Sequence, residues 1–123
     1  MNGMTAMKIT EAFKNGPLLM EGALGERLKR EFGFFPDENI ALAAHVYNAS
    51  ARDALQNIWI EYAEISARYA FPLMITTPTR RANSERTANS VFGESVIADN
   101  MSFARDVQKN AARQSICWRA YRL

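Results

Sequence analysis

Two short segments of the sequence combine an apolar run with residues that could bind a small charged ligand. Glu21 and Gly22 follow the apolar residues 18–20, and Thr77 and Thr79 follow a second apolar run. A carboxylate can hold an ammonium group, and a glycine lets the backbone approach a ligand. Threonine hydroxyls can donate hydrogen bonds to a ligand carboxylate. An acid near the start of a helix is also favoured by the helix dipole, so Glu21 has a structural interpretation of equal weight.

Both candidate segments lie where a β-strand is predicted to end. Residues 18–20 suit a brief buried strand, and residues 73–77 form a β-rich run that Pro78 stops. Strands that alternate with helices favour a parallel sheet, in which ligands bind on the loops after the strands. We therefore expect an α/β fold whose two strands are adjacent and parallel, with Glu21 and Thr77 at the same end.

The clearest helix is predicted between the two strands. Apolar residues recur at helical spacing over residues 55–69, which is the pattern of one buried helix face. Ser50 and Asp53 resemble a capping box at its start, and Pro72 requires the helix to end near Ala70. This helix is expected to form part of the crossover that joins the parallel strands.

Further helices are expected before and after this one, from apolar periods or from capping residues. Their expected bounds are residues 24–32 with Gly33 as the stop, Asp37 to about Tyr47, a short helix capped by Asn83 or Ser84, and residues 100–113. On the last of these helices, Phe103, Val107 and Ala111 are expected to share one face.

The composition limits the class of protein and its partners. The chain has 123 residues, a net charge of +2 and a pI near 8.9, which is too weakly basic to indicate nucleic acid or a membrane surface as a partner. The single cysteine, Cys117, excludes an internal disulfide framework and a cysteine zinc cluster. The sequence shows no secretory signal and no apolar stretch of about 20 residues that could span a bilayer. One cytoplasmic domain over residues 1–123 is therefore expected.

Other residues with chemical potential have simpler structural interpretations. His45, the single histidine, is expected to have a surface or structural role, and Tyr62 is expected to pack against its neighbours. Arg80, Arg81 and Arg86 form a basic cluster that could meet an anion, although such a cluster is typical of a solvated loop.

Two motifs of the sequence resemble one family of enzymes. The segment "LLMEGALGERL", residues 18–28, resembles the first strand end of the homocysteine S-methyltransferase family, Asp-Gly-Gly/Ala-hydrophobic-Gly-Thr-x-Leu. The segment "ITTPTRRAN", residues 75–83, is similar to the second strand end of that family, Thr-x-Thr-Phe-x-Ala-Asn. Glu21 stands where the family usually has aspartate, one methylene shorter. The similarity extends over about residues 18–112.

The resemblance implies a zinc-dependent TIM (β/α)₈ barrel that methylates homocysteine, as in methionine biosynthesis, from a small-molecule donor such as S-methylmethionine. In such an enzyme zinc binds the acceptor thiol as a thiolate. The family holds zinc with three downstream cysteines that this chain lacks, so methyl transfer by this chain alone is not expected. The residues that the resemblance places around the thiol acceptor are Glu21, Gly22, Thr77, Thr79 and Asn83.

A complete barrel takes about 250 residues, so the chain is expected to supply an incomplete barrel, the first two β/α units with added helices. Residues 113–123 are expected to be a tail that diverges from the family or is truncated. The open barrel edge would leave Leu18, Leu19 and residues 73–75 poorly shielded and predicts self-association. The alternatives are an inactive fragment and a non-enzymatic, mainly helical module that binds a partner.

Overall fold

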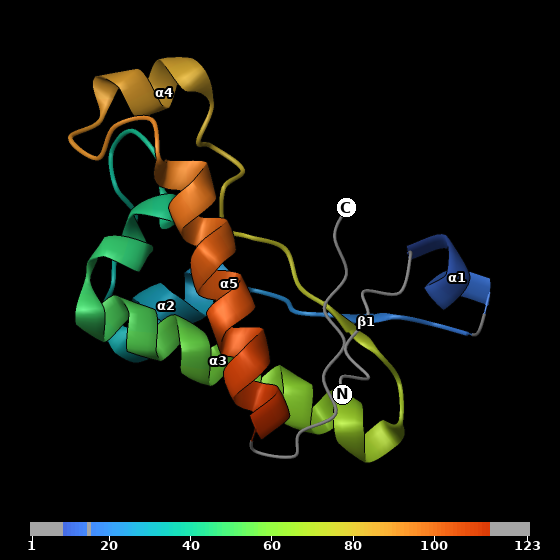
Figure 1. The fold of residues 1–123 in the computed structure, drawn as a ribbon. Coiled ribbons are helices and arrows are strands. Elements are labelled where there is room, and N and C mark those ends of the chain that lie inside the picture. Colours follow the sequence, from blue (N-terminus) through green and yellow to red (C-terminus); the bar gives the residue numbers. More distant parts are fainter. Residues whose placement is uncertain (1–8, 15, 114–123) are drawn as a thin grey trace.

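The computed structural model describes residues 9–14 and 16–113, most of which lie in helices beside a short parallel sheet (Figure 1). In chain order the elements are α1 (Ile9–Lys14), β1 (Leu19–Met20), α2 (Leu24–Phe32), the 3₁₀ helix η1 (Leu42–Tyr47), α3 (Ala49–Tyr69), β2 (Leu73–Met74), α4 (Ser84–Asn89) and α5 (Val96–Arg113). The expected mixture of helices and a parallel sheet is confirmed. Cys117 and the predicted tail beyond Arg113 lie outside the described residues.

β1 and β2 are adjacent and parallel, as predicted, with Leu19 opposite Leu73. Both strands are shorter than predicted. The amide of Thr76 donates its hydrogen bond to the side chain of Glu21 instead of to a strand neighbour, so the ladder does not continue. The expectation that the first strand is buried is wrong for Met20, which is 52% exposed.

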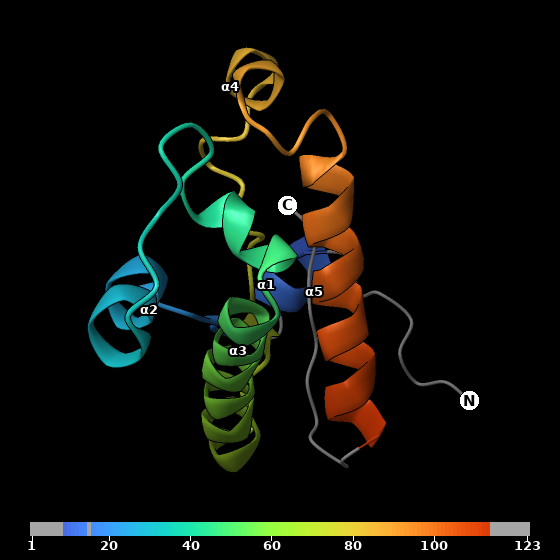
Figure 2. The ribbon, with the colours of Figure 1, turned by 90° about the vertical axis from the view of Figure 1, so that its left-hand side faces the viewer.

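α3 lies at the centre of the core and packs beside α5, as Figure 2 shows. Trp59 of α3 is fully buried and stacks on Phe103 of α5, with the ring centroids 5.7 Å apart. α5 begins at Val96, earlier than the predicted residue 100. Its buried face includes Phe103, Val107 and Ala111, as predicted.

The apolar side chains of β2 and of the residue after it are buried, which contradicts the poor shielding predicted for residues 73–75, whereas Leu18 and Leu19 are half-buried. Leu73, Met74 and Ile75 are 0%, 6% and 7% exposed. Leu73 and Ile75 belong to the same apolar cluster as Ile58 of α3 and Val107 of α5. The helices of this chain therefore cover the face of β2 that was expected to need the rest of a barrel.

The C-terminal ends of α2 and α3 agree with the sequence, and the start of α3 does not. Gly33 stops α2 in the left-handed conformation, and Ala70 does the same for α3. The start of α3 differs, because Asn48 is the N-cap and its Oδ1 atom accepts a hydrogen bond from the amide of Ala51 at 3.1 Å. Ser50 already lies inside the helix, so the predicted capping box is wrong.

The predicted helix from Asp37 to Tyr47 is replaced by a turn followed by η1. The carboxylate of Asp37 accepts hydrogen bonds from the amides of Asn39, at 2.8 Å, and Ile40, at 3.0 Å. Ala41 then has a φ of 51°, and a right-handed helix cannot continue through a positive φ. The helical part therefore begins only after this residue, and it has 3₁₀ geometry.

Candidate functional site

Glu21 lies directly after β1, at the edge of the sheet where both strands end. Its Oε1 atom accepts hydrogen bonds from the amide of Thr76, at 2.9 Å, and from the Thr76 hydroxyl, at 3.1 Å. Parallel strands bring their carboxyl ends to one edge, which is why residues 55 positions apart meet here. The Oε2 atom of Glu21 is buried and has no hydrogen-bond partner among the described residues.

The bonding of Glu21 separates the two interpretations of this residue. A role as the N-terminal acid of α2 would place its carboxylate on the first amides of that helix. Instead, α2 begins after Ala23 without a side-chain cap, and the carboxylate bonds across the sheet to Thr76. A buried oxygen without a partner is unfavourable, so this atom favours a ligand that donates a hydrogen bond, most strongly a charged one.

Gly22 connects this corner to α3. The Tyr62 hydroxyl donates a hydrogen bond to the Gly22 carbonyl oxygen at 2.8 Å. A Cβ atom at Gly22 would meet no atom within 4 Å, so packing does not require glycine at this position. The open space leaves room for a ligand to approach the backbone, which is the role expected of this glycine.

Thr77 and Thr79 form a small turn after β2. Their hydroxyl oxygens are 2.8 Å apart, and the Thr79 amide donates to the Thr77 carbonyl oxygen at 2.8 Å. The hydroxyl that reaches Glu21 belongs instead to Thr76, a residue expected only to extend the strand. Its position as the first polar residue after the second apolar run is the signal that could have identified it. We call Glu21, Gly22 and Thr76 the Glu21 corner.

Asn83 lies apart from the other expected site residues. Its Oδ1 atom accepts a hydrogen bond from the Arg86 amide at 2.8 Å, so Asn83 caps α4, one of the two predicted alternatives. α4 lies at one end of the molecule, away from β1 and β2 in Figure 1 and from α3 in Figure 2. The structure thus gives Asn83 a capping role and does not bring it to Glu21.

The expected basic cluster is divided between two environments. Arg80 and Arg81 are exposed, as expected of a solvated loop. Arg86 is half-buried, and its Nη1 atom donates to the Asn39 carbonyl oxygen at 2.9 Å. Arg86 therefore fixes the turn before η1, and the three arginines do not share one exposed face.

His45 is buried in η1 rather than placed at the surface. Its ring meets the edge of Phe34 with the centroids 6.3 Å apart, and only 6% of the residue is exposed. The Nε2 atom has no hydrogen-bond partner in the part of the chain that the structure describes. Burial lowers the pKa of His45 below its ordinary value. These contacts support the structural role expected of His45.

The described residues do not fit the zinc centre that the resemblance implies. Within residues 9–14 and 16–113, no group of three or more His, Cys, Asp or Glu side chains is placed to hold a metal ion. Zinc sites in proteins take three or four such ligands. No chemical step is therefore assigned to zinc in this chain.

The sequence matches no protein-family model, and neither curated proteins nor solved structures contain a match to it. Among the described residues, no helix is both long enough and apolar enough to cross a membrane.

Proposed function

We propose that the chain is the N-terminal portion of a methyltransferase of the homocysteine S-methyltransferase type, built on an incomplete TIM barrel. Its Glu21 corner binds the amino group of the thiol acceptor. The observation that carries this proposal is the Glu21 carboxylate at the shared end of two parallel strands, with Oε1 held by Thr76 and Oε2 buried without a partner among the described residues. The motifs around Glu21 and Thr77 add the resemblance in sequence.

The Glu21 corner suits an amino-acid thiol such as homocysteine. The ammonium group donates to Oε2 of Glu21 in a charge-assisted hydrogen bond. Oε1 of Glu21 is bonded to Thr76, while Oε2 has no hydrogen-bond partner among the described residues. The hydroxyls of Thr77 and Thr79, on the adjoining turn, can donate to the ligand carboxylate. These residues bind and orient the acceptor, while the methyl donor and the transfer step need groups that the described residues do not supply.

Titration calorimetry with homocysteine tests this proposal. Glu21→Gln keeps the shape of the side chain and removes its charge, so the affinity should fall about tenfold or more. Glu26→Gln is the matched control, because Glu26 lies on the exposed surface of α2 and its loss should leave the affinity unchanged. N-acetylhomocysteine lacks the ammonium group, so it should not bind to the natural sequence or to either variant. Equal affinity of the natural sequence and Glu21→Gln would contradict the assignment.

A second candidate is a non-enzymatic helical module that binds a partner. The observation in its favour is the burial of Leu73, Met74 and Ile75 by helices of the same chain, which gives these residues a closed core. A monomer that melts cooperatively and does not bind homocysteine would support this candidate over the first.

A further inference from the structure

Tyr62 links the long helix α3 to the loop that carries the Glu21 corner. Its hydroxyl donates a 2.8 Å hydrogen bond to the carbonyl oxygen of Gly22, 40 positions earlier in the chain. Gly22 directly follows Glu21. The bond therefore restrains the peptide unit next to the residue that presents the carboxylate.

The loop after β1 depends on backbone hydrogen bonds of this kind. Gly22 has no side chain, and a Cβ atom there would meet nothing within 4 Å, so side-chain packing cannot fix its conformation. The next residue, Ala23, has a φ of 53°. A residue other than glycine adopts such a φ only where its surroundings hold it there. The bond from Tyr62 to Gly22 is a contact that supplies this restraint.

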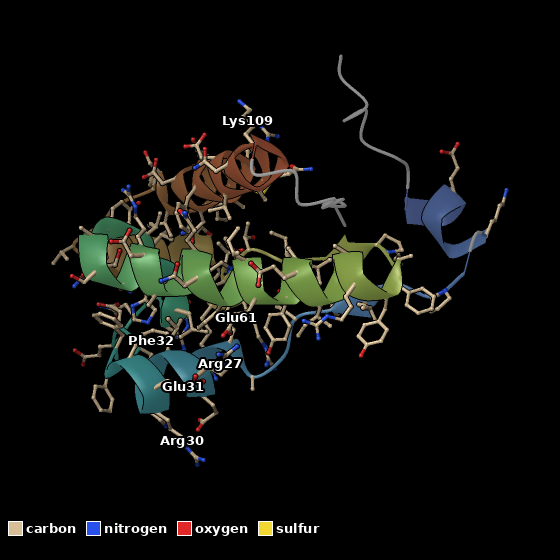
Figure 3. All side chains as sticks on the ribbon, turned by 90° about the horizontal axis from the view of Figure 1, so that it is seen from below. Arg27, Arg30, Glu31, Phe32, Glu61 and Lys109 are labelled. Carbon is tan, nitrogen blue, oxygen red and sulfur yellow. The ribbon has the colours of Figure 1, made fainter. Side chains whose placement is uncertain are left out.

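The ring of Tyr62 is itself held by Arg27 of α2. The Arg27 guanidinium carbon lies 5.8 Å from the ring centroid, within the range of a cation–π contact. Arg27 pairs with Glu61 of α3, with Nη2 and Oε2 2.6 Å apart, and with Glu31 of its own helix. Figure 3 shows Arg27 between these two carboxylates. A guanidinium bound on both sides has little freedom, so it fixes the orientation of the ring and of its hydroxyl.

We propose that Tyr62 is a positioning residue for the Glu21 corner. Its hydroxyl holds the Gly22 peptide so that Oε1 of Glu21 reaches Thr76 and Oε2 remains available to a ligand. The consequence for acceptor binding rests on the proposed function. The consequence for the bond between Glu21 and Thr76 does not, because both partners of that bond are residues of the chain.

The test is Tyr62→Phe, which removes the hydroxyl and keeps the ring beside Arg27. The matched control is Tyr69→Phe, which removes a hydroxyl from an exposed residue of the same helix. The readout is the Thr76 amide in the ¹H–¹⁵N NMR spectrum, since an amide proton bonded to a carboxylate shifts downfield and exchanges slowly. In Tyr62→Phe this signal should move upfield and exchange about tenfold faster. It should stay in place in Tyr69→Phe, and both variants should keep nearly the natural melting temperature.

A second readout is the affinity for homocysteine, which should fall about tenfold in Tyr62→Phe and not in the control. An unchanged Thr76 signal in Tyr62→Phe overturns the positioning role. If the natural sequence does not bind homocysteine, the proposed function fails, while the Thr76 signal still decides the role of Tyr62. If Tyr62→Phe does not fold, Tyr62→Leu replaces it, because leucine also removes the hydroxyl that reaches Gly22. An unmoved Thr76 signal in that variant would overturn the proposal equally.

Discussion

Four buried side-chain atoms lack a hydrogen-bond partner among the described residues, and they differ in their surroundings. They are Oε2 of Glu21, Nε2 of His45, Nε1 of Trp59 and Oδ1 of Asn100. Asn100 makes other bonds, since its Nδ2 atom donates to two backbone carbonyls, one of them Ala43 of η1 at 3.0 Å. His45 and Trp59 are enclosed in the core. Glu21 is the half-buried residue of the four, so its surroundings are the least enclosed, although Oε2 itself is buried.

His45 should make the stability of the protein depend on pH near neutrality. Its ordinary pKa is 6.5, and burial lowers that value in the folded state. The unfolded chain therefore binds the proton more readily, so stability is complete above about pH 6.5 and falls as the pH drops through the folded pKa. Urea unfolding from pH 8 to pH 5 should show this loss. His45→Phe removes the single histidine and should flatten the curve between pH 6.5 and pH 5, whereas parallel curves for the two proteins would contradict the assignment.

At the level of elements, the sequence predicts those helices that bury one continuous face. The apolar period over residues 55–69 and the shared face of Phe103 and Val107 both correspond to observed helices. The segment after Asp37 was predicted wrongly, because its carboxylate competes with a helix for the backbone amides. Asn48 and Ser50 are both good capping residues, and only the extended backbone at Asn48 decides between them.

The cap of α3 gives a direct test at this scale. Asn48→Ala removes the acceptor for the Ala51 amide and should lower the free energy of unfolding by about 1 kcal/mol. Ser50→Ala is the control, since Ser50 is exposed within the first turn, and its effect should stay within about 0.5 kcal/mol. Chemical denaturation of both variants measures the difference. A larger loss in Ser50→Ala than in Asn48→Ala would restore the predicted capping box.

At the level of the whole molecule, the site could be predicted from the sequence only in part. Apolar runs locate the strand ends, so they predict Glu21 and the threonine segment as site residues, and the contact between these two segments follows from the parallel pairing. The partner of Glu21 proved to be Thr76, because the strands are short and one side chain replaces a ladder bond. The position of Asn83 depends on how α4 packs, and the burial of the β2 side chains depends on how α3 and α5 pack. Those arrangements are properties of the complete fold and leave no local pattern in the sequence.

Self-association remains a prediction, but the burial of β2 restricts where it can occur. Met20 of β1 is 52% exposed and belongs to a strand that is paired with β2, so β1 is the expected contact edge. Met20→Lys should shift the protein toward monomer in sedimentation velocity without lowering its melting temperature. Val91→Lys is the control, because Val91 is 92% exposed and lies outside the sheet. A natural sequence that stays monomeric at all concentrations would contradict the prediction.

The pairing of β1 with β2 also sets the order in which the parts of the molecule can form. α2 and α3 are built from contacts between near neighbours in the chain, whereas Glu21 and Thr76 meet across 55 positions. Closing so long a loop lowers the entropy of the chain more than forming a helix from neighbouring residues does. Contacts between residues far apart in the sequence therefore form late in folding. The Glu21 corner should therefore be completed after the helical core has assembled. During synthesis it cannot exist until Thr76 has left the ribosome, although Glu21 has emerged long before.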